Sequence, residues 1–153
     1  MLETASFRKA KNKKMSDPIL SPEAKLLATK RGVGDLAEKM GIELVELSAE
    51  RSVATMPVAG NTQPRGLLHG GAHLVLGETL GSMAANVWAG PESYAVGIEI
   101  SASHSKSATA GMVTGVATAI TLGKTLTVHE IVITNEMGER CSTVRITNLI
   151  RKN

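Results

Sequence analysis

Aromatic side chains are almost absent from this sequence of 153 residues, which contains only Phe7, Trp88 and Tyr94. Proteins that recognise single-stranded nucleic acids stack the bases on aromatic rings, so we expect no nucleic-acid partner. The single cysteine, Cys141, excludes an intramolecular disulfide framework and fits a reducing cytoplasm. No apolar run approaches the roughly 20 residues that cross a bilayer, so we expect no membrane partner either.

The net charge of +3 comes from one short segment near the N-terminus. Residues 8–14 carry five of the 17 basic side chains, whereas the sequence beyond residue 14 has 12 basic and 13 acidic residues. No hydrophobic run follows this segment, as it would in a signal peptide. We therefore predict a flexible basic tail over residues 1–20 and a single, nearly neutral domain over residues 21–153. A contact of the tail with nucleic acid or anionic lipid is the alternative interpretation.

Local signals place helices and strands along the domain. Ser21 followed by Pro22 is typical of a helix start, and this helix is expected to break near residues 32–34 and to end at Gly41. Alternating apolar and polar residues predict two strands before the centre of the chain, and segments rich in Val, Ile and Thr predict four after residue 90. The predicted strands cover residues 42–50, 52–57, 94–103, 108–122, 125–135 and 140–150. The short connections between the later strands favour antiparallel neighbours.

Between the two groups of strands lies an apolar helix that contains a lone carboxylate. Glu78 is the only charged side chain between Ala72 and Trp88. An ionised carboxylate loses hydration in such surroundings, and a purely structural helix would carry Leu or Ala there. Glycines at the helix start leave backbone N–H groups without side-chain cover. Backbone donors at the start of a helix, with a carboxylate about two turns further on, suit attack on a carbonyl whose oxygen becomes negative.

A long apolar helix among five or six antiparallel strands can be buried only if the sheet curls around it. The sequence therefore predicts an α+β fold in which the sheet wraps a central helix. Gly71, Gly77 and Gly81 are expected to allow close packing of the helix against the sheet, at a cost in helix propensity.

The run from Gln63 through His69, Gly70 and Gly71 to Glu78 and Ser82 resembles the hotdog-fold acyl-CoA thioesterases. Within that family it is similar to the branch of 1,4-dihydroxy-2-naphthoyl-CoA thioesterase, Arthrobacter-type 4-hydroxybenzoyl-CoA thioesterase and phenylacetate-degradation thioesterases. The resemblance implies a hotdog fold and a cytoplasmic hydrolase of menaquinone biosynthesis or aromatic degradation. It also implies that no separate cofactor is needed, because coenzyme A is part of the substrate.

The resemblance assigns a role to each residue of the run. Glu78 matches the catalytic carboxylate, which acts as nucleophile or general base on the thioester carbonyl. Gly70 matches the residue whose backbone N–H polarises the thioester oxygen, and Gln63 and His69 match polar groups that flank the reacting centre. Ser82 lies one helical turn after Glu78, so the two side chains share a face and can share a water. The family completes this site across a dimer interface and pairs its dimers, which implies a homodimer or homotetramer.

The resemblance also places the coenzyme outside the helix. His104 and Lys106 match positions near the nucleotide or the pantetheine arm, and Lys124, beside Gly123, is similarly placed to meet phosphate. The family often has Arg at both lysine positions. Lys keeps the charge but lacks the bidentate fork of Arg.

The acyl group stays open at this point. The resemblance implies an aromatic acyl group such as dihydroxynaphthoyl or hydroxybenzoyl. The low aromatic content predicts an acyl pocket of aliphatic and Met side chains, for which medium-chain or broad-range acyl-CoA is an equal alternative. Two other classes compete with hydrolysis: a hydratase or dehydratase of acyl thioesters, whose Asp–His motif is not found here, and a non-catalytic acyl-CoA-binding hotdog domain, which would not need Glu78.

Simpler interpretations apply to several of these residues. His69 could merely cap the helix, and Ser82 could merely permit close packing. His69 and His73 have the spacing of a metal pair with Glu78 as a third ligand, but no HExxH pattern is present and we expect no metal. Cys141 lies in an alternating strand without a basic neighbour, so we do not expect it to act as a nucleophile.

Overall fold

The computed structural model describes residues 16–153, and the basic segment 8–14 lies outside the described residues. The elements that it contains are β1 Ile19–Leu20, α1 Pro22–Arg31, α2 Asp35–Lys39, β2 Glu43–Leu47, β3 Arg51–Pro57, α3 Gly70–Ala89, β4 Ser93–His104, β5 Met112–Leu122, β6 Leu126–Thr134 and β7 Arg140–Lys152. Ile19 and Leu20, which belong to the predicted tail, pair in parallel with the end of β2. No helix of residues 16–153 is long and apolar enough to cross a membrane.

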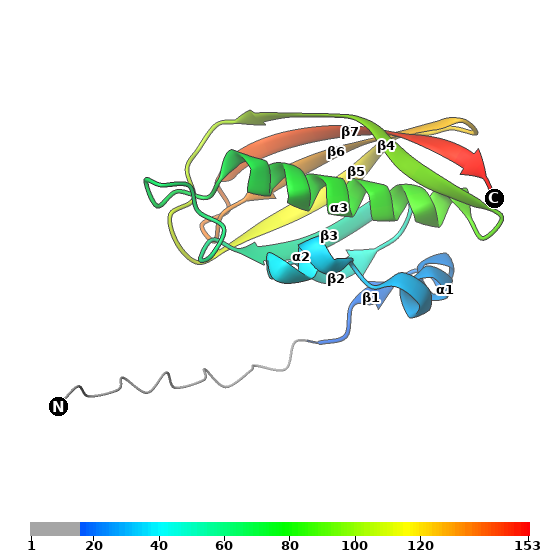
Figure 1. The fold of residues 1–153 in the computed structure, drawn as a ribbon, viewed down its shortest axis with the longest axis horizontal. Coiled ribbons are helices and arrows are strands. Elements are labelled where there is room, and N and C mark those ends of the chain that lie inside the picture. Colours follow the sequence, from blue (N-terminus) through cyan, green and yellow to red (C-terminus); the bar gives the residue numbers. More distant parts are fainter. Residues whose placement is uncertain (1–15) are drawn as a thin grey trace.

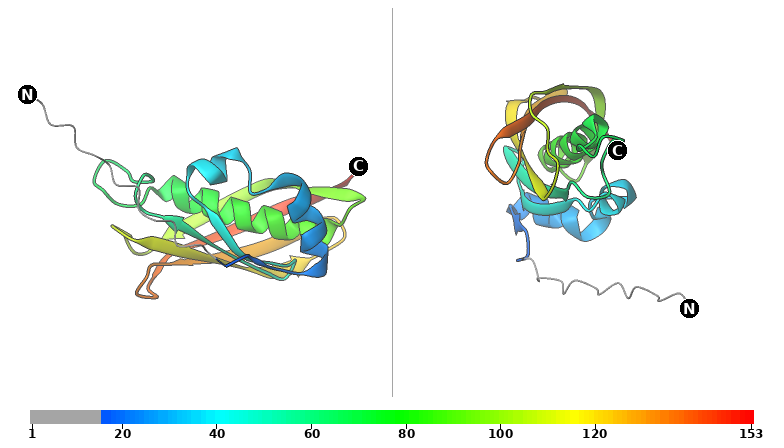
Figure 2. Two further views of the ribbon diagram at one scale, coloured as in Figure 1. Left: turned by 90° about the horizontal axis from the view of Figure 1, so that it is seen from below. Right: turned by 90° about the vertical axis from the view of Figure 1, so that its left-hand side faces the viewer.

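Helix α3 lies in the concave face of one curved sheet, as Figures 1 and 2 show. The apolar side chains Leu76 and Leu80 of α3 are fully buried, as are Val144 and Ile146 of β7 on the facing side. This arrangement confirms the predicted α+β fold with a sheet wrapped on a central helix.

Two glycines set how closely α3 approaches β7. A Cβ atom on Gly77 would lie 2.6 Å from Val144 Cγ1, and one on Gly81 would lie 2.3 Å from Ile146 Cγ2. Any larger side chain would push the helix away from the strand, so the predicted packing role of these glycines is confirmed. Gly71 differs, because a Cβ atom there would lie 3.1 Å from Nδ1 of the His69 ring and would not meet the sheet.

The strand order β1-β2-β3-β5-β6-β7-β4 departs from the expected pairing of successive strands. β4 pairs antiparallel with β7 at the edge of the sheet, and β5 pairs with β3 and β6. The expectation that β4 and β5 are neighbours was wrong. The connection over residues 105–111 is long enough to pass the ends of β6 and β7, because three strand spacings amount to about 14 Å and seven extended residues reach about 23 Å.

The N-terminal helices begin and break where the sequence predicts. Ser21 caps α1 by accepting a hydrogen bond from the Ala24 N–H at 3.1 Å, with Pro22 as the first helical residue. The chain then leaves helical geometry at Gly32 and Gly34, both with positive φ, before α2 starts. This break lies beside α3 and helps to enclose space next to Glu78.

Candidate active site

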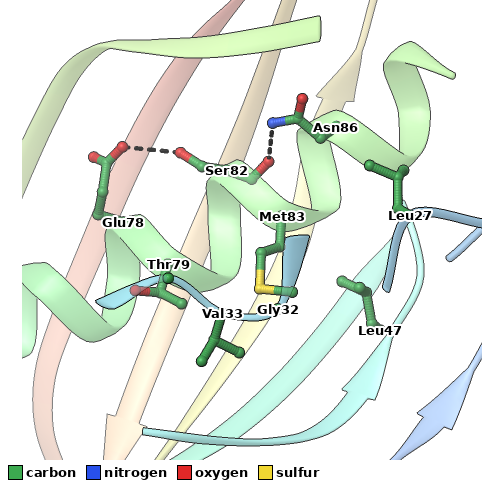
Figure 3. Close-up of a pocket in the computed structure, with 10 residues that line it drawn as sticks. Leu27, Gly32, Val33, Leu47, Glu78, Thr79, Ser82, Met83 and Asn86 are labelled. Atoms are coloured by element: carbon green, nitrogen blue, oxygen red, sulfur yellow. Dashed lines mark hydrogen bonds between the residues drawn. The ribbon is translucent and has the colours of Figure 1, made fainter. Parts of the chain in front are cut away.

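Glu78 and Ser82 share one face of α3, as their spacing predicts. The Ser82 hydroxyl donates to Glu78 Oε1 at 2.9 Å (Figure 3). Both side chains are half-buried, so the carboxylate reaches space next to the helix without being sealed in the core. A hydrogen bond to the ionised form is the compensation that a carboxylate in apolar surroundings needs.

Gly97 on β4 is part of this site and was not predicted from the sequence. A Cβ atom there would lie 2.7 Å from Glu78 Oε1, so glycine leaves room for the carboxylate in its present orientation against the strand. The pairing of β4 with β7 shifts register between Gly97 and Glu99, which is a local irregularity of the strand. A glycine inside a strand often marks a bulge or a close approach, and that signal was available in the sequence.

Two cavities meet at Glu78. One, of about 300 Å³, is lined by Ser82, Met83 and side chains of α1 and β2, and the other, of about 440 Å³, extends toward α2. Val33, Gly34 and Thr79 line both, so the break between α1 and α2 lies where the two spaces join. The carboxylate can therefore reach a bound molecule from either space.

The start of α3 has more side-chain cover than expected. His69 is the N-cap residue, and its Nδ1 accepts a hydrogen bond from the Gly71 N–H at 2.8 Å. The expectation of an uncapped helix start was therefore wrong for Gly71, because the ring of the preceding histidine reaches back to it. The Gly70 N–H has no hydrogen-bond partner in the part of the chain that the structure describes. Gly70 thus keeps one backbone donor free for a ligand.

A third cavity, of about 490 Å³, brings together four of the predicted site residues at this end of α3. Gln63, Gly70, His104 and Lys106 line it, together with His73. Gln63 Oε1 accepts from the Arg65 N–H at 2.6 Å, so the carbonyl end of this amide is engaged with its own loop. The residues of the helix start and of the end of β4 thus lie next to one another in space.

Two histidines lie against each other in this cavity. The rings of His73 and His104 have centroids 5.1 Å apart, and His73 is 3% exposed. Burial, with a smaller contribution from the nearby His104, lowers the pKa of His73 to about 4, so this ring is neutral at pH 7.

The hydrogen bonds assign the proton of His104. Ser142 Oγ donates to the Ser103 carbonyl at 3.2 Å, so it accepts from His104 Nδ1, 3.0 Å away. In the neutral ring His104 Nε2 then carries the lone pair, and this atom lies 2.9 Å from the place that a Cβ on Gly70 would take. The ring therefore presents an acceptor beside the free Gly70 N–H.

The structure does not bring all predicted site residues into one place. Glu78 does not line the cavity of Gly70 and His104, and eight residues of α-helix separate it from Gly70 by about 12 Å along the axis. Gly123 and Lys124 lie still further away, because Gly123 accepts a hydrogen bond from Trp88 Nε1 at the other end of α3. Within one chain the carboxylate and the two lysines thus occupy three separate regions.

The exposed Lys106 pairs with Glu139 of the β6–β7 turn. This hydrogen bond is the main reason why the pKa of Glu139 lies below its usual value. An incoming anion would compete with Glu139 for the lysine, and an exposed ion pair of this kind contributes little to stability.

The alternative chemistries find little support in the described residues. No three His, Cys, Asp or Glu side chains of residues 16–153 are grouped so as to hold a metal ion. Cys141 is buried on β7, and this burial raises the pKa of its thiol, so the reactive thiolate is disfavoured.

Protonation of His73 should make the protein less stable in acid. The folded-state pKa lies below the unfolded value of 6.5, so the unfolded chain binds the proton first as the pH falls. The contribution of neutral His73 to the free energy of unfolding is complete above pH 6.5. It is lost between pH 6.5 and about 4, at about 1.4 kcal/mol per pH unit. Urea unfolding at several pH values should therefore show a smaller loss of unfolding free energy in His73→Gln than in the wild type. His69→Gln is the matched control, and equal pH slopes in all three proteins would contradict the assignment.

Comparison with known proteins identifies the family. The sequence profile of the thioesterase superfamily matches residues 65–142, which include α3, β4, β5 and β6 and the start of β7. The chain is similar to the proofreading thioesterase EntH of Cronobacter turicensis, with 46% identity over 119 residues, or 77% of this chain and 87% of the relative. It is 40% identical to the 1,4-dihydroxy-2-naphthoyl-CoA hydrolase of Escherichia coli over 78% of this chain and 88% of the relative.

A solved structure agrees with the sequence comparison. The crystal structure of thioesterase HI1161 from Haemophilus influenzae superposes with a TM-score of 0.75 at 33% identity, over 83% of this chain and 87% of that chain. The wrapped sheet, the central helix and these similarities lead to one conclusion. The chain belongs to the thioesterase superfamily and has its hotdog fold.

Proposed function

We propose that this chain hydrolyses acyl-CoA thioesters, with Glu78 as nucleophile or general base. The observation that carries the proposal is a half-buried carboxylate placed between two cavities and hydrogen-bonded to Ser82. Its second oxygen is left to attack the thioester carbon or to take a proton from water. Membership of the thioesterase superfamily and the names of the relatives support hydrolysis over the hydratase and the non-catalytic alternatives.

The thioester oxygen needs a donor, and we propose the free Gly70 N–H for this role, with Gln63 and His69 as flanking groups. Gly70 and Glu78 of one chain line different cavities, so one chain alone does not offer both to the same thioester. A second copy of the chain, packed with its α3 antiparallel to the first, would bring its Gly70 toward Glu78. We therefore propose a homodimer with two shared sites, and a pair of such dimers as the tetrameric form.

The coenzyme would bind along the outside of such a dimer. His104 and Lys106 lie next to Gly70, so they are proposed to meet the pantetheine arm or the nucleotide. Lys124 and Gly123 lie at the opposite end of α3 and could reach the same coenzyme only from the partner chain. Phosphate groups attract lysine as a point charge, so each of these contacts would weaken as salt rises.

Removal of the carboxylate should abolish most turnover. Glu78→Gln keeps the shape of the side chain but loses the basic oxygen, and we expect kcat to fall about 10²-fold to 10⁴-fold. Release of free thiol from acyl-CoA measures the loss, and thermal unfolding checks that the fold is intact. Asp35→Asn, which removes another carboxylate that lines one of the same cavities, is the control and should leave kcat within about twofold. Retention of more than a third of wild-type turnover by Glu78→Gln would rule out the proposed role.

Mixed dimers test the shared site. Gly70→Pro removes the N–H at the first helical position, where proline is well tolerated, and His69 already has the extended backbone that precedes proline. Gly70→Ala adds the Cβ but keeps the N–H, so it is the matched control. Glu78→Gln and Gly70→Pro should each be nearly inactive, yet re-associated mixtures should recover about a quarter of wild-type activity, because half of the dimers are mixed and each has one intact site. If the mixture stays as inactive as its components, the site lies within one chain.

The cavity between α3, α1 and β2 supports an apolar acyl group of moderate size. Its volume of about 300 Å³ lies at the lower end of the range for small-molecule pockets. Its apolar wall is formed by Leu27, Val33, Leu47 and Met83, as Figure 3 shows. No aromatic side chain of residues 16–153 lines it, so a ring gains no stacking partner among them.

Apart from Glu78, the polar side chains of this cavity already form hydrogen bonds within the protein. Thr79 donates to the Val75 carbonyl at 2.8 Å, and the Asn86 amide is bonded to the backbone of Ser82 and of Ala95. A hydroxyl group at the far end of the acyl group, away from Glu78, would therefore be buried without a partner, at a cost of about 1–3 kcal/mol. We propose an aliphatic acyl group of medium length as the preferred substrate. The aromatic acyl group implied by the resemblance remains a prediction that the same experiment tests.

A panel of acyl-CoA substrates separates these two candidates. We expect kcat/KM to be highest for octanoyl-CoA or decanoyl-CoA, and to be about 5-fold to 100-fold lower for 4-hydroxybenzoyl-CoA than for benzoyl-CoA because of the unpaired hydroxyl. The pair of benzoyl substrates isolates the hydroxyl from the ring. A higher kcat/KM for the hydroxylated member, or for dihydroxynaphthoyl-CoA over all aliphatic substrates, would contradict the proposed pocket.

A further inference from the structure

A buried amide stands on β7 in a row of apolar side chains. Val144, Ile146 and Asn148 alternate along the strand, and all three are buried on the face that meets α3. Asn148 is fully buried and is the register partner of Gly97 on β4, the residue that makes room for the Glu78 carboxylate. A third apolar residue would be expected at this position, because a buried amide is costly unless its groups are bonded.

Asn148 contacts the side chain that holds Glu78. Ser82 Oγ lies 3.0 Å from Asn148 Oδ1 and 2.9 Å from Glu78 Oε1. A hydroxyl has a single proton, so Ser82 cannot donate to both oxygens at once. Asn148 Nδ2, at the other end of the same amide, is buried without a partner among the described residues.

One orientation of the amide resolves this conflict. A half-turn about its terminal bond brings Nδ2 toward Ser82, where it donates to Oγ. The Ser82 proton is then directed to Glu78 Oε1. Ser82 Oγ accepts from Asn148, and Glu78 Oε1 accepts from Ser82, so each of the two oxygens has one donor. The orphaned atom becomes a carbonyl oxygen, which is less costly to leave unpaired than an N–H group.

We propose that Asn148 is a positioning residue that acts on Glu78 through Ser82. Its Nδ2–H fixes the Ser82 hydroxyl so that the hydroxyl proton always points to Glu78. The carboxylate is thereby held by Oε1 in its ionised form, and Oε2 faces the substrate. This inference rests on the proposed role of Glu78 in hydrolysis.

A double-mutant cycle tests the chain of contacts. Asn148→Leu keeps the approximate shape of the side chain but removes the donor, and Ser82→Ala removes the hydroxyl through which it acts. We expect each single change to lower kcat by about 3-fold to 10-fold with little change in KM, since each loses about one hydrogen bond to the reacting group. The double variant should be no slower than Ser82→Ala alone. The proposal would be overturned if the loss of kcat in the double variant equalled the product of the two single losses, or if Asn148→Leu left kcat unchanged.

The pH profile provides a readout that a purely structural role would not move. A donor to a carboxylate favours its ionised form over its protonated form, so loss of the donor should move the acidic limb of kcat/KM to higher pH. Among the described residues, Asp35 is the other ionisable side chain that lines either cavity around Glu78, and it is unchanged in all variants. Asn148→Leu should shift the limb in the same direction as Ser82→Ala, and it should cause no further shift in the Ser82→Ala background.

Controls separate the possible failures. If Asn148→Leu does not fold, as judged by thermal unfolding, Asn148→Val removes the same donor with a side chain suited to a strand, and the same cycle applies. The Glu78→Gln variant separates this inference from the proposed function. If Glu78→Gln is inactive and Asn148→Leu retains full turnover with an unmoved pH profile, the role of Asn148 is wrong and that of Glu78 stands. If Glu78→Gln retains turnover, both are wrong.

Discussion

The close approach of α3 to β7 is the constraint on which the rest of the structure depends. Gly77 and Gly81 have no Cβ where Val144 and Ile146 contact the helix, so these two side chains pack directly against the helix backbone. A long helix that is largely apolar can be buried in a domain of this size only when the sheet curls around it at such short range. The wrapping of the sheet and the position of the cavities beside the helix depend on this contact.

The same contact determines where Glu78 lies. Residues next to the two glycines on the helix are rotated by about 100°, so Glu78 and Ser82 lie beside the packed face rather than opposite to it. The carboxylate therefore stands at the boundary between the core and the cavities, next to the edge strand β4. Gly97 provides the space there, and Ser82 provides the hydrogen bond. A carboxylate in this position is half-hydrated and held in one orientation, which suits it to react with a bound carbonyl group.

The polar groups of the molecule are distributed along the whole length of α3. Gly70, His104 and Lys106 lie at its start, Glu78 lies near its middle, and Lys124 lies beyond its end. A thioester and the phosphates of its coenzyme extend over a comparable length. An arrangement of two antiparallel helices would place the start of one beside the middle of the other, which is the geometry of the proposed homodimer.

The sequence by itself determined the local structure and identified the candidate reacting group. The Ser21 cap, the break at residues 32–34, the long helix and its lone carboxylate depend on neighbouring residues, so they could be predicted without knowledge of the fold. The resemblance of the run from Gln63 to Ser82 added the family and the roles of its residues. Contacts between distant segments were decided only by the tertiary structure. These include the pairing of β4 with β7, the place of Gly97 against Glu78, the capping of Gly71 by His69 and the burial of His73 beside His104. The physical reason is that a strand pattern fixes which face of a strand is buried but not which strand lies next to it, and the pKa values and cavities of the site depend on those neighbours.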